Sequence, residues 1–173
     1  MFSLRFRADQ VNYWAARYNY QNADDEADLR VRSIQPARER GWLLKEEFLA
    51  IAKWKSPRNF RRYKANKPGY VEEVTRLALS HSTSDQMRIE SLTLLSGVGW
   101  PVASAILHLC HQDYYPILDF RALWSLKCKV PAKYDFAFWR EYTRTARQLR
   151  SRLNCDMRTL DKALWQYSNE RQK

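Results

Sequence analysis

Two glycines flank a single valine in this chain, and an aspartate follows them at a distance. A glycine turn can bind a phosphate, and an aspartate can act as a catalytic group on the molecule to which that phosphate belongs. Gly97 and Gly99 surround Val98 directly after the apolar stretch IESLTLL. Pro101 then opens a second apolar stretch, VASAILHL. Glycine tolerates positive φ and lets a backbone approach closely, and proline suits the first position of a helix. The pattern predicts a helix, a tight turn and a second helix.

Such a turn leaves backbone N–H groups unpaired at the start of the second helix. The positive end of the helix dipole favours an anion there, such as a DNA phosphate. Gly97, Val98, Gly99 and Trp100 are therefore candidate DNA-binding residues. We expect Trp100 to be exposed, because it follows the turn directly.

Asp119 is the candidate catalytic residue. A carboxylate beside a sugar whose glycosidic bond is breaking stabilises the developing positive charge and can orient a water molecule. Aspartate is also a favoured helix N-cap, and the residues that follow, FRALWSLK, suit a helix. The two roles are compatible, so both stay open.

A run of cations with interleaved rings is the second candidate DNA contact. Residues 53–67 contain seven lysines and arginines and no acidic residue, with Trp54, Phe60 and Tyr63 among them. Cations and stacking surfaces together suit a nucleic-acid backbone and unstacked bases. The candidates are Arg58, Arg61, Arg62 and Lys64. A stripe of arginines recurs at helical steps over residues 140–150, where adjoining acids make a solvated surface a plausible interpretation.

The net charge and length fit a nucleic-acid-binding domain. The formal charge is +11 on 173 residues, which favours a polyanionic partner. The first ten residues do not resemble a signal peptide, and no apolar run is long enough to cross a membrane. We expect a cytoplasmic protein, nucleoid-associated if bacterial.

The elements that must hold these residues are helices. Apolar residues at three- and four-residue steps predict helices over residues 8–20, 41–54, 70–80, 136–153 and 157–168, beside the two around the turn and one beginning at Asp119. Residues 24–32 fit either a helix or a loop. Helical spacing predicts burial of Trp14, Trp124, Trp139 and Trp165. Alternating patterns are scarce, so the predicted class is all-α.

Taken together, LLSGVGWPVASAIL and YYPILD resemble the signature of the helix-hairpin-helix DNA glycosylases, the superfamily of endonuclease III. Asp119 lies twenty residues after Gly99, which is the superfamily's separation. The resemblance covers about 25 residues and joins hairpin, spacing and aspartate. It implies a flipped nucleotide in duplex DNA as the substrate and Asp119 as the catalytic residue.

The chain departs from the bifunctional members of that superfamily. They carry a lysine nucleophile two residues after the second glycine, where this chain has Pro101. Three scattered cysteines exclude the four-cysteine iron–sulfur cluster of the endonuclease III branch. His108 and His111 lie three apart but lack a third ligand, so we expect no metal site, although the resemblance leaves room for a monovalent or divalent ion at the hairpin.

The resemblance also implies how the helices are arranged. Within one compact helical domain over residues 1–173, residues 25–115 would form a helical barrel with the hairpin at 88–111. Residues 1–24 and 116–173 would form a second subdomain, with a cleft between the two. The expected function is a monomeric, monofunctional DNA glycosylase of base excision repair. The alternatives are a non-catalytic DNA-binding protein in a larger repair or defence assembly and an RNA- or nucleotide-acting protein.

Overall fold

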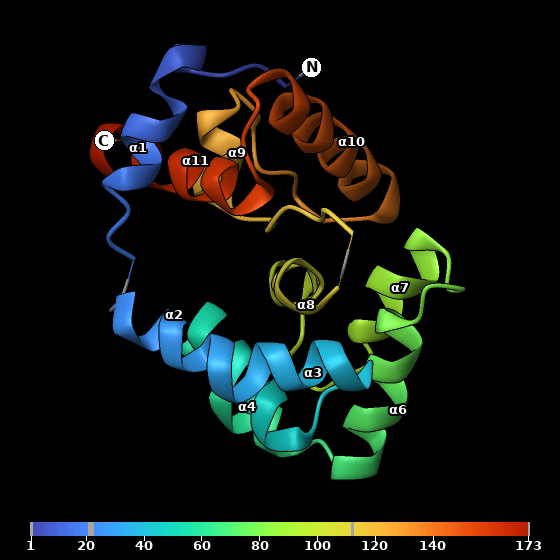
Figure 1. Ribbon diagram of the computed structural model, residues 1–173. Coiled ribbons are helices and arrows are strands. Elements are labelled where there is room, and N and C mark those ends of the chain that lie inside the picture. Colours follow the sequence, from blue (N-terminus) through green and yellow to red (C-terminus); the bar gives the residue numbers. More distant parts are fainter. Residues whose placement is uncertain (1, 21–22, 112, 173) are drawn as a thin grey trace. The chain divides into compact units, whose positions relative to one another are not determined.

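The computed structural model describes residues 2–20, 23–111 and 113–172 (Figure 1). These residues form helices joined by short loops, and none of them lies in a β-strand, which confirms the predicted all-α class. Within the same residues, we find no helix with the length and apolar character that crossing a membrane requires.

The α-helices are α1 (Val11–Ala16), α2 (Ala23–Leu29), α3 (Gln35–Arg40), α4 (Lys45–Lys55), α5 (Phe60–Lys64), α6 (Pro68–Leu79), α7 (Asp85–Leu92), α8 (Trp100–Cys110), α9 (Phe120–Ser125), α10 (Phe136–Arg152) and α11 (Met157–Arg171). Single 3-10 turns precede α1 and α5, at Ala8–Gln10 and Pro57–Asn59, and a π-helical segment, Arg30–Ile34, joins α2 to α3.

The chain divides into two compact units. One, which we call the hairpin unit, is Ala23–Asp113, and the other, the terminal unit, combines Met1–Asn22 with Tyr114–Lys173. Residues 21–22 and 112, next to the points where the chain passes between the units, lie outside the described residues. Each unit is described below by itself.

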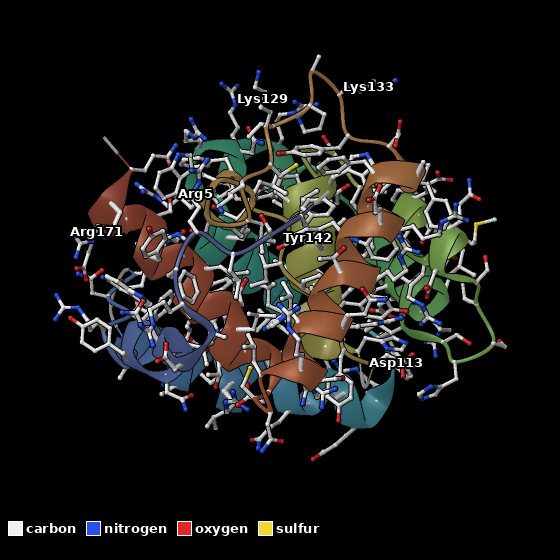
Figure 2. The ribbon with its side chains drawn as sticks, turned by 90° about the horizontal axis from the view of Figure 1, so that it is seen from above. Arg5, Asp113, Lys129, Lys133, Tyr142 and Arg171 are labelled. Carbon is white, nitrogen blue, oxygen red and sulfur yellow. The ribbon has the colours of Figure 1, made fainter. Side chains whose placement is uncertain are left out.

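In the terminal unit, α1 and α9 both pack against α11 (Figure 1). The segment before α1 is tied to the end of α9, because Arg5 N donates to the Ser125 carbonyl at 2.9 Å. Tyr142 of α10 is fully buried, and its hydroxyl donates to the Ile117 carbonyl at 2.8 Å. The loop between α9 and α10 carries Lys129 and Lys133, whose side chains point outward (Figure 2).

Two of the four tryptophans predicted to be buried belong to the core of the terminal unit. Trp14 and Trp139 are buried, as predicted. Trp124 and Trp165 are only half-buried, in contrast to the prediction, and a guanidinium group lies near each ring. The Arg5 guanidinium lies 4.5 Å from the Trp124 ring centroid, and that of Arg121 lies 5.3 Å from the Trp165 centroid.

The hairpin unit differs from the predicted helices before residue 45. Helical structure continues from Ala23 to Arg40 and ends at Gly41, whose φ of 87° is the left-handed conformation of a helix C-cap. The sequence prediction of a helix from 41 was therefore wrong by four residues. Pro36 is accommodated inside this helix after a wider turn, in which the Gln35 N–H bonds to the Arg30 carbonyl.

Helix α8 forms the centre of the hairpin unit. Eight of its residues are buried, and it contacts α3, α4, α6 and α7 (Figure 1). Both predicted proline breaks are present, since α4 ends at Lys55 before Ser56-Pro57 and α6 begins at Pro68. Helix α5, inside the basic run, was not predicted.

Candidate functional site

The GVG segment is a tight turn between α7 and α8. The Val98 N–H donates to the Leu95 carbonyl at 3.0 Å, and Gly97 has a φ of 87°. Gly99 is the N-cap of α8, and its carbonyl accepts from the N–H groups of Val102 and Ala103. Val98 is buried, so the turn is fixed to the core by its central side chain.

Only the first glycine of the turn is required by its surroundings. A Cβ built on Gly97 would lie 2.9 Å from the Cβ of Arg62 and 2.9 Å from two ring carbons of Tyr63. Gly99 has an extended backbone, and the atom nearest to its Cβ would be Pro101 Cδ at 3.8 Å. Gly97 therefore lets α5 pack directly on the turn, and the predicted basic run and the predicted hairpin come together.

Two asparagines that the sequence analysis did not select hold this contact. The buried Asn66 side chain accepts from Ser96 N at 2.8 Å and donates to the Ser96 carbonyl at 3.1 Å. Asn59 Nδ2 donates to the Gly97 carbonyl at 3.2 Å. A side-chain amide can donate and accept at once, which suits an exposed turn whose backbone groups lack helical partners. In the sequence, only the position of Asn59 and Asn66 within the basic run points to this role.

The surface formed here by α5 and the turn is strongly cationic. Arg58, Arg61, Arg62 and Lys64 are exposed, and none forms an ion pair with a described residue. The ammonium groups of Lys53 and Lys64 lie 5.5 and 5.4 Å from the centroid of the Phe60 ring. We call these residues together with Gly97 and Gly99 the hairpin–α5 surface.

In the turn, backbone donors rather than backbone acceptors lack partners among the described residues. The N–H groups of Gly97 and Gly99 donate to no described residue. The carbonyls of Leu95, Ser96 and Gly97 already accept from Val98 N, Asn66 Nδ2 and Asn59 Nδ2. An anion thus suits the turn better than a cation.

Trp100 is half-buried rather than exposed, in contrast to the sequence prediction. It is the first residue of α8, directly after the N-cap Gly99. The exposed apolar residue beside the turn is Leu94, with 62% of its surface accessible.

Asp119, in the terminal unit, is the N-cap of α9, as its structural interpretation predicted. Its backbone is extended, its Oδ1 accepts from Arg121 N at 2.9 Å, and its carbonyl accepts from Leu123 N at 3.0 Å. The side chain is half-buried, so the carboxylate is neither core nor fully solvated.

Two phenols lie within the electrostatic reach of this carboxylate. Burial raises the pKa of Tyr134 and that of Tyr142, and the negative charge of Asp119 raises both further. Both hydroxyls therefore stay protonated at neutral pH. The sequence analysis did not connect either tyrosine with Asp119, because 15 and 23 residues separate them from it.

Of the two histidines after the hairpin, His108 lies in α8 and His111 is the C-cap of that helix. His111 is 3% exposed, and its Nε2 faces the guanidinium of Arg88. Burial first, and then the charge of Arg88, lowers the pKa of His111 to about 4. Among the described residues, no group of three or more His, Cys, Asp or Glu side chains is placed to hold a metal ion.

Comparison with models of protein families, with curated proteins and with solved structures finds no match for this chain.

Proposed function

We propose that this chain binds duplex DNA as a monomer and hydrolyses the N-glycosidic bond of a damaged or modified base, as a monofunctional DNA glycosylase. The observation that carries the proposal is the hairpin–α5 surface. Unpaired backbone N–H groups of a GVG turn and four exposed cations without acidic partners lie together there.

Binding would use charge and backbone rather than base edges. A phosphate at the turn accepts from the N–H groups of Gly97 and Gly99, at the positive end of α8. Arg58, Arg61, Arg62 and Lys64 neutralise neighbouring phosphates and release their counterions. Affinity should then be independent of sequence and fall steeply as salt rises.

Catalysis would rest on Asp119. Its place twenty residues after Gly99 is the position of the catalytic aspartate in the glycosylases that the chain resembles. With the base turned out of the stack, an ionised carboxylate stabilises the oxocarbenium-like sugar and orients a water molecule for attack. Pro101 stands where bifunctional enzymes have their lysine, so water rather than an amine attacks, and the abasic strand stays uncut.

One observation favours a second candidate, a DNA-binding protein without catalysis. The Asp119 carboxylate already caps α9 through Arg121 N, which is enough to explain an aspartate at this position. Such a protein would use the hairpin–α5 surface within a larger repair or defence assembly.

An assay of base release separates the two candidates. The full chain is incubated with duplexes that carry a panel of damaged or modified bases, and alkali reveals abasic sites. Asp119→Asn should bind DNA as the parent does but release no base, because the amide can still cap the helix while it loses the charge. Asp135→Asn is the matched control, since Asp135 caps α10 through Phe138 N in the same unit.

Each outcome points to one candidate. Base release that Asp119→Asn abolishes and Asp135→Asn retains supports the glycosylase, and borohydride should then trap no covalent complex. DNA binding without release of any base across the panel supports the non-catalytic protein. A borohydride-trapped adduct contradicts the monofunctional mechanism. Absence of salt-sensitive duplex binding contradicts both candidates.

A further inference from the structure

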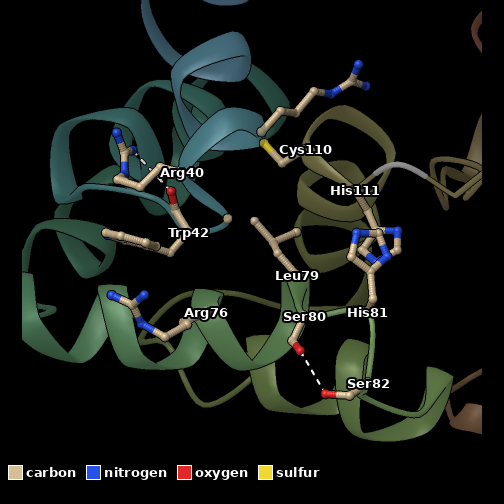
Figure 3. A pocket seen from close by; sticks show the side chains of 11 residues that line it. Arg40, Trp42, Arg76, Leu79, Ser80, His81, Ser82, Cys110 and His111 are labelled. Carbon is tan, nitrogen blue, oxygen red and sulfur yellow. Dashed lines mark hydrogen bonds between the residues drawn. The ribbon is translucent and has the colours of Figure 1, made fainter.

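A pocket in the hairpin unit lies apart from the residues of the hairpin–α5 surface. It has a volume of about 480 Å³ and is lined by the end of α3, the turn after it and the C-terminal ends of α6 and α8 (Figure 3). Pockets that bind small molecules typically measure roughly 300–1,000 Å³. The volume therefore suits a ligand of mononucleotide size.

Three arginines line this pocket, and no acidic residue is among the described residues that line it. Arg40 is neutralised, because it pairs with the buried carboxylate of Glu47. Arg38 and Arg76 are exposed and form no ion pair with a described residue. Two guanidinium charges thus remain for a ligand.

Both free guanidinium groups are held in place by neutral partners. The Arg76 guanidinium lies 3.5 Å from the centroid of the Trp42 ring, and Trp42 stands between Arg76 and Arg40 (Figure 3). Arg38 Nε donates to the Leu109 carbonyl at 2.7 Å, which leaves its terminal nitrogens for other acceptors. Pre-positioned guanidinium groups lose less conformational entropy when they bind an oxyanion.

The other end of the pocket carries hydroxyl and imidazole groups. The hydroxyls of Ser80 and Ser82 lie 3.0 Å apart, and the ring centroids of His81 and His111 are 5.6 Å apart (Figure 3). Hydroxyls can donate to phosphate oxygens, and an exposed imidazole offers a flat face to a base. The combination of two cations, hydroxyls and a flat ring fits a phosphate attached to a small organic group.

We propose that this pocket binds a phosphate monoester of mononucleotide size, with Arg38 and Arg76 supplying the positive charge that recognises the phosphate. Such a group can come from a free nucleotide or from the 5′-phosphate at a strand end. The proposal does not depend on the glycosylase reaction, because none of the residues assigned to that reaction lines the pocket.

The test uses the full chain, with adenosine monophosphate as the probe. Calorimetric titration gives the affinity, and the indole N–H signal of Trp42, assigned through Trp42→Phe, reports the site in two-dimensional NMR. Parallel titrations use inorganic phosphate, adenosine, and a short oligonucleotide with and without a 5′-phosphate. The free nucleotide and the phosphorylated strand end are thereby distinguished as sources.

Adenosine monophosphate or the 5′-phosphorylated strand should bind saturably and shift the Trp42 signal, whereas adenosine and the unphosphorylated strand should not. Arg76→Gln and Arg38→Gln should each weaken binding by about tenfold, as expected for loss of one charged hydrogen-bond donor. Arg30→Gln is the matched control, because Arg30 is exposed in the same unit and does not line the pocket.

Three results would overturn the proposal. Equal binding of adenosine and adenosine monophosphate would show that the phosphate does not contribute to recognition. An equal loss of affinity in Arg30→Gln would show that only net charge matters. No saturable binding of any phosphorylated probe, in a chain whose circular dichroism shows intact helices, would mean that the pocket holds no such ligand.

Discussion

Alanine at Gly97 should destabilise the protein far more than alanine at Gly99, although both glycines belong to the same turn. At Gly97 the left-handed backbone costs an L-residue about 1–2 kcal/mol. The new Cβ would also lie 2.9 Å from Arg62 Cβ and from the buried ring of Tyr63. Forcing a methyl group into such a contact adds about 1–3 kcal/mol. The expected loss is therefore about 2–5 kcal/mol of unfolding free energy.

The two other glycines at helix ends supply the controls. Gly99 has an extended backbone and room for a Cβ, so the small loss from a poorer N-cap and the small gain from a less flexible unfolded chain should cancel to within about 0.5 kcal/mol. Gly41 shares the φ of 87° but has nothing within 4 Å, so Gly41→Ala should cost only the backbone strain, about 1–2 kcal/mol.

Urea unfolding of the three variants, followed by circular dichroism, gives the free energies directly. The expected order of loss is Gly97→Ala, then Gly41→Ala, then Gly99→Ala. Gly97→Ala should also weaken DNA binding under native conditions, because it separates α5 from the turn. If Gly97→Ala and Gly99→Ala proved equally stable, the close packing of α5 on the turn would be wrong.

Two further predictions concern charge. Reversing Arg61 and Arg62 to glutamate should weaken duplex binding at low salt by at least about tenfold. The same reversal at Arg30 and Arg32 should cost less affinity, and Arg32 pairs with Asp28 at 2.6 Å. Equal losses of affinity in a gel-shift assay would contradict a local DNA footprint. Since the pKa of His111 is lowered from 6.5 to about 4, its contribution to stability is complete above pH 6.5 and is lost as pH falls towards 4. Unfolding free energy should thus drop by about 2 kcal/mol between pH 7.5 and 5. His111→Gln should flatten the pH dependence of the unfolding free energy, whereas His81→Gln, which changes an exposed side chain, should preserve it. If His111→Gln leaves the pH dependence unchanged, its assignment to His111 is wrong.

Local sequence was sufficient for the helical class and for the helix ends that prolines and N-caps mark. The period of apolar residues fixes which face a helix buries, and caps and prolines act within one turn of the chain. The GVG turn, the proline breaks and the N-cap at Asp119 could therefore be predicted. The helix through Pro36 could not, because the π-helical turn that accommodates proline is stabilised by its packing rather than by its composition.

Only the tertiary structure decided which of the predicted residues meet. That Gly97 rather than Gly99 must be glycine depends on Arg62 and Tyr63, which lie more than thirty positions earlier in the chain. The roles of Asn59 and Asn66, the burial of His111 and the pocket between the ends of α3, α6 and α8 arise in the same way. Sequence patterns report on neighbours along a helix, whereas close approach, desolvation and shared cavities are properties of segments that only folding brings together.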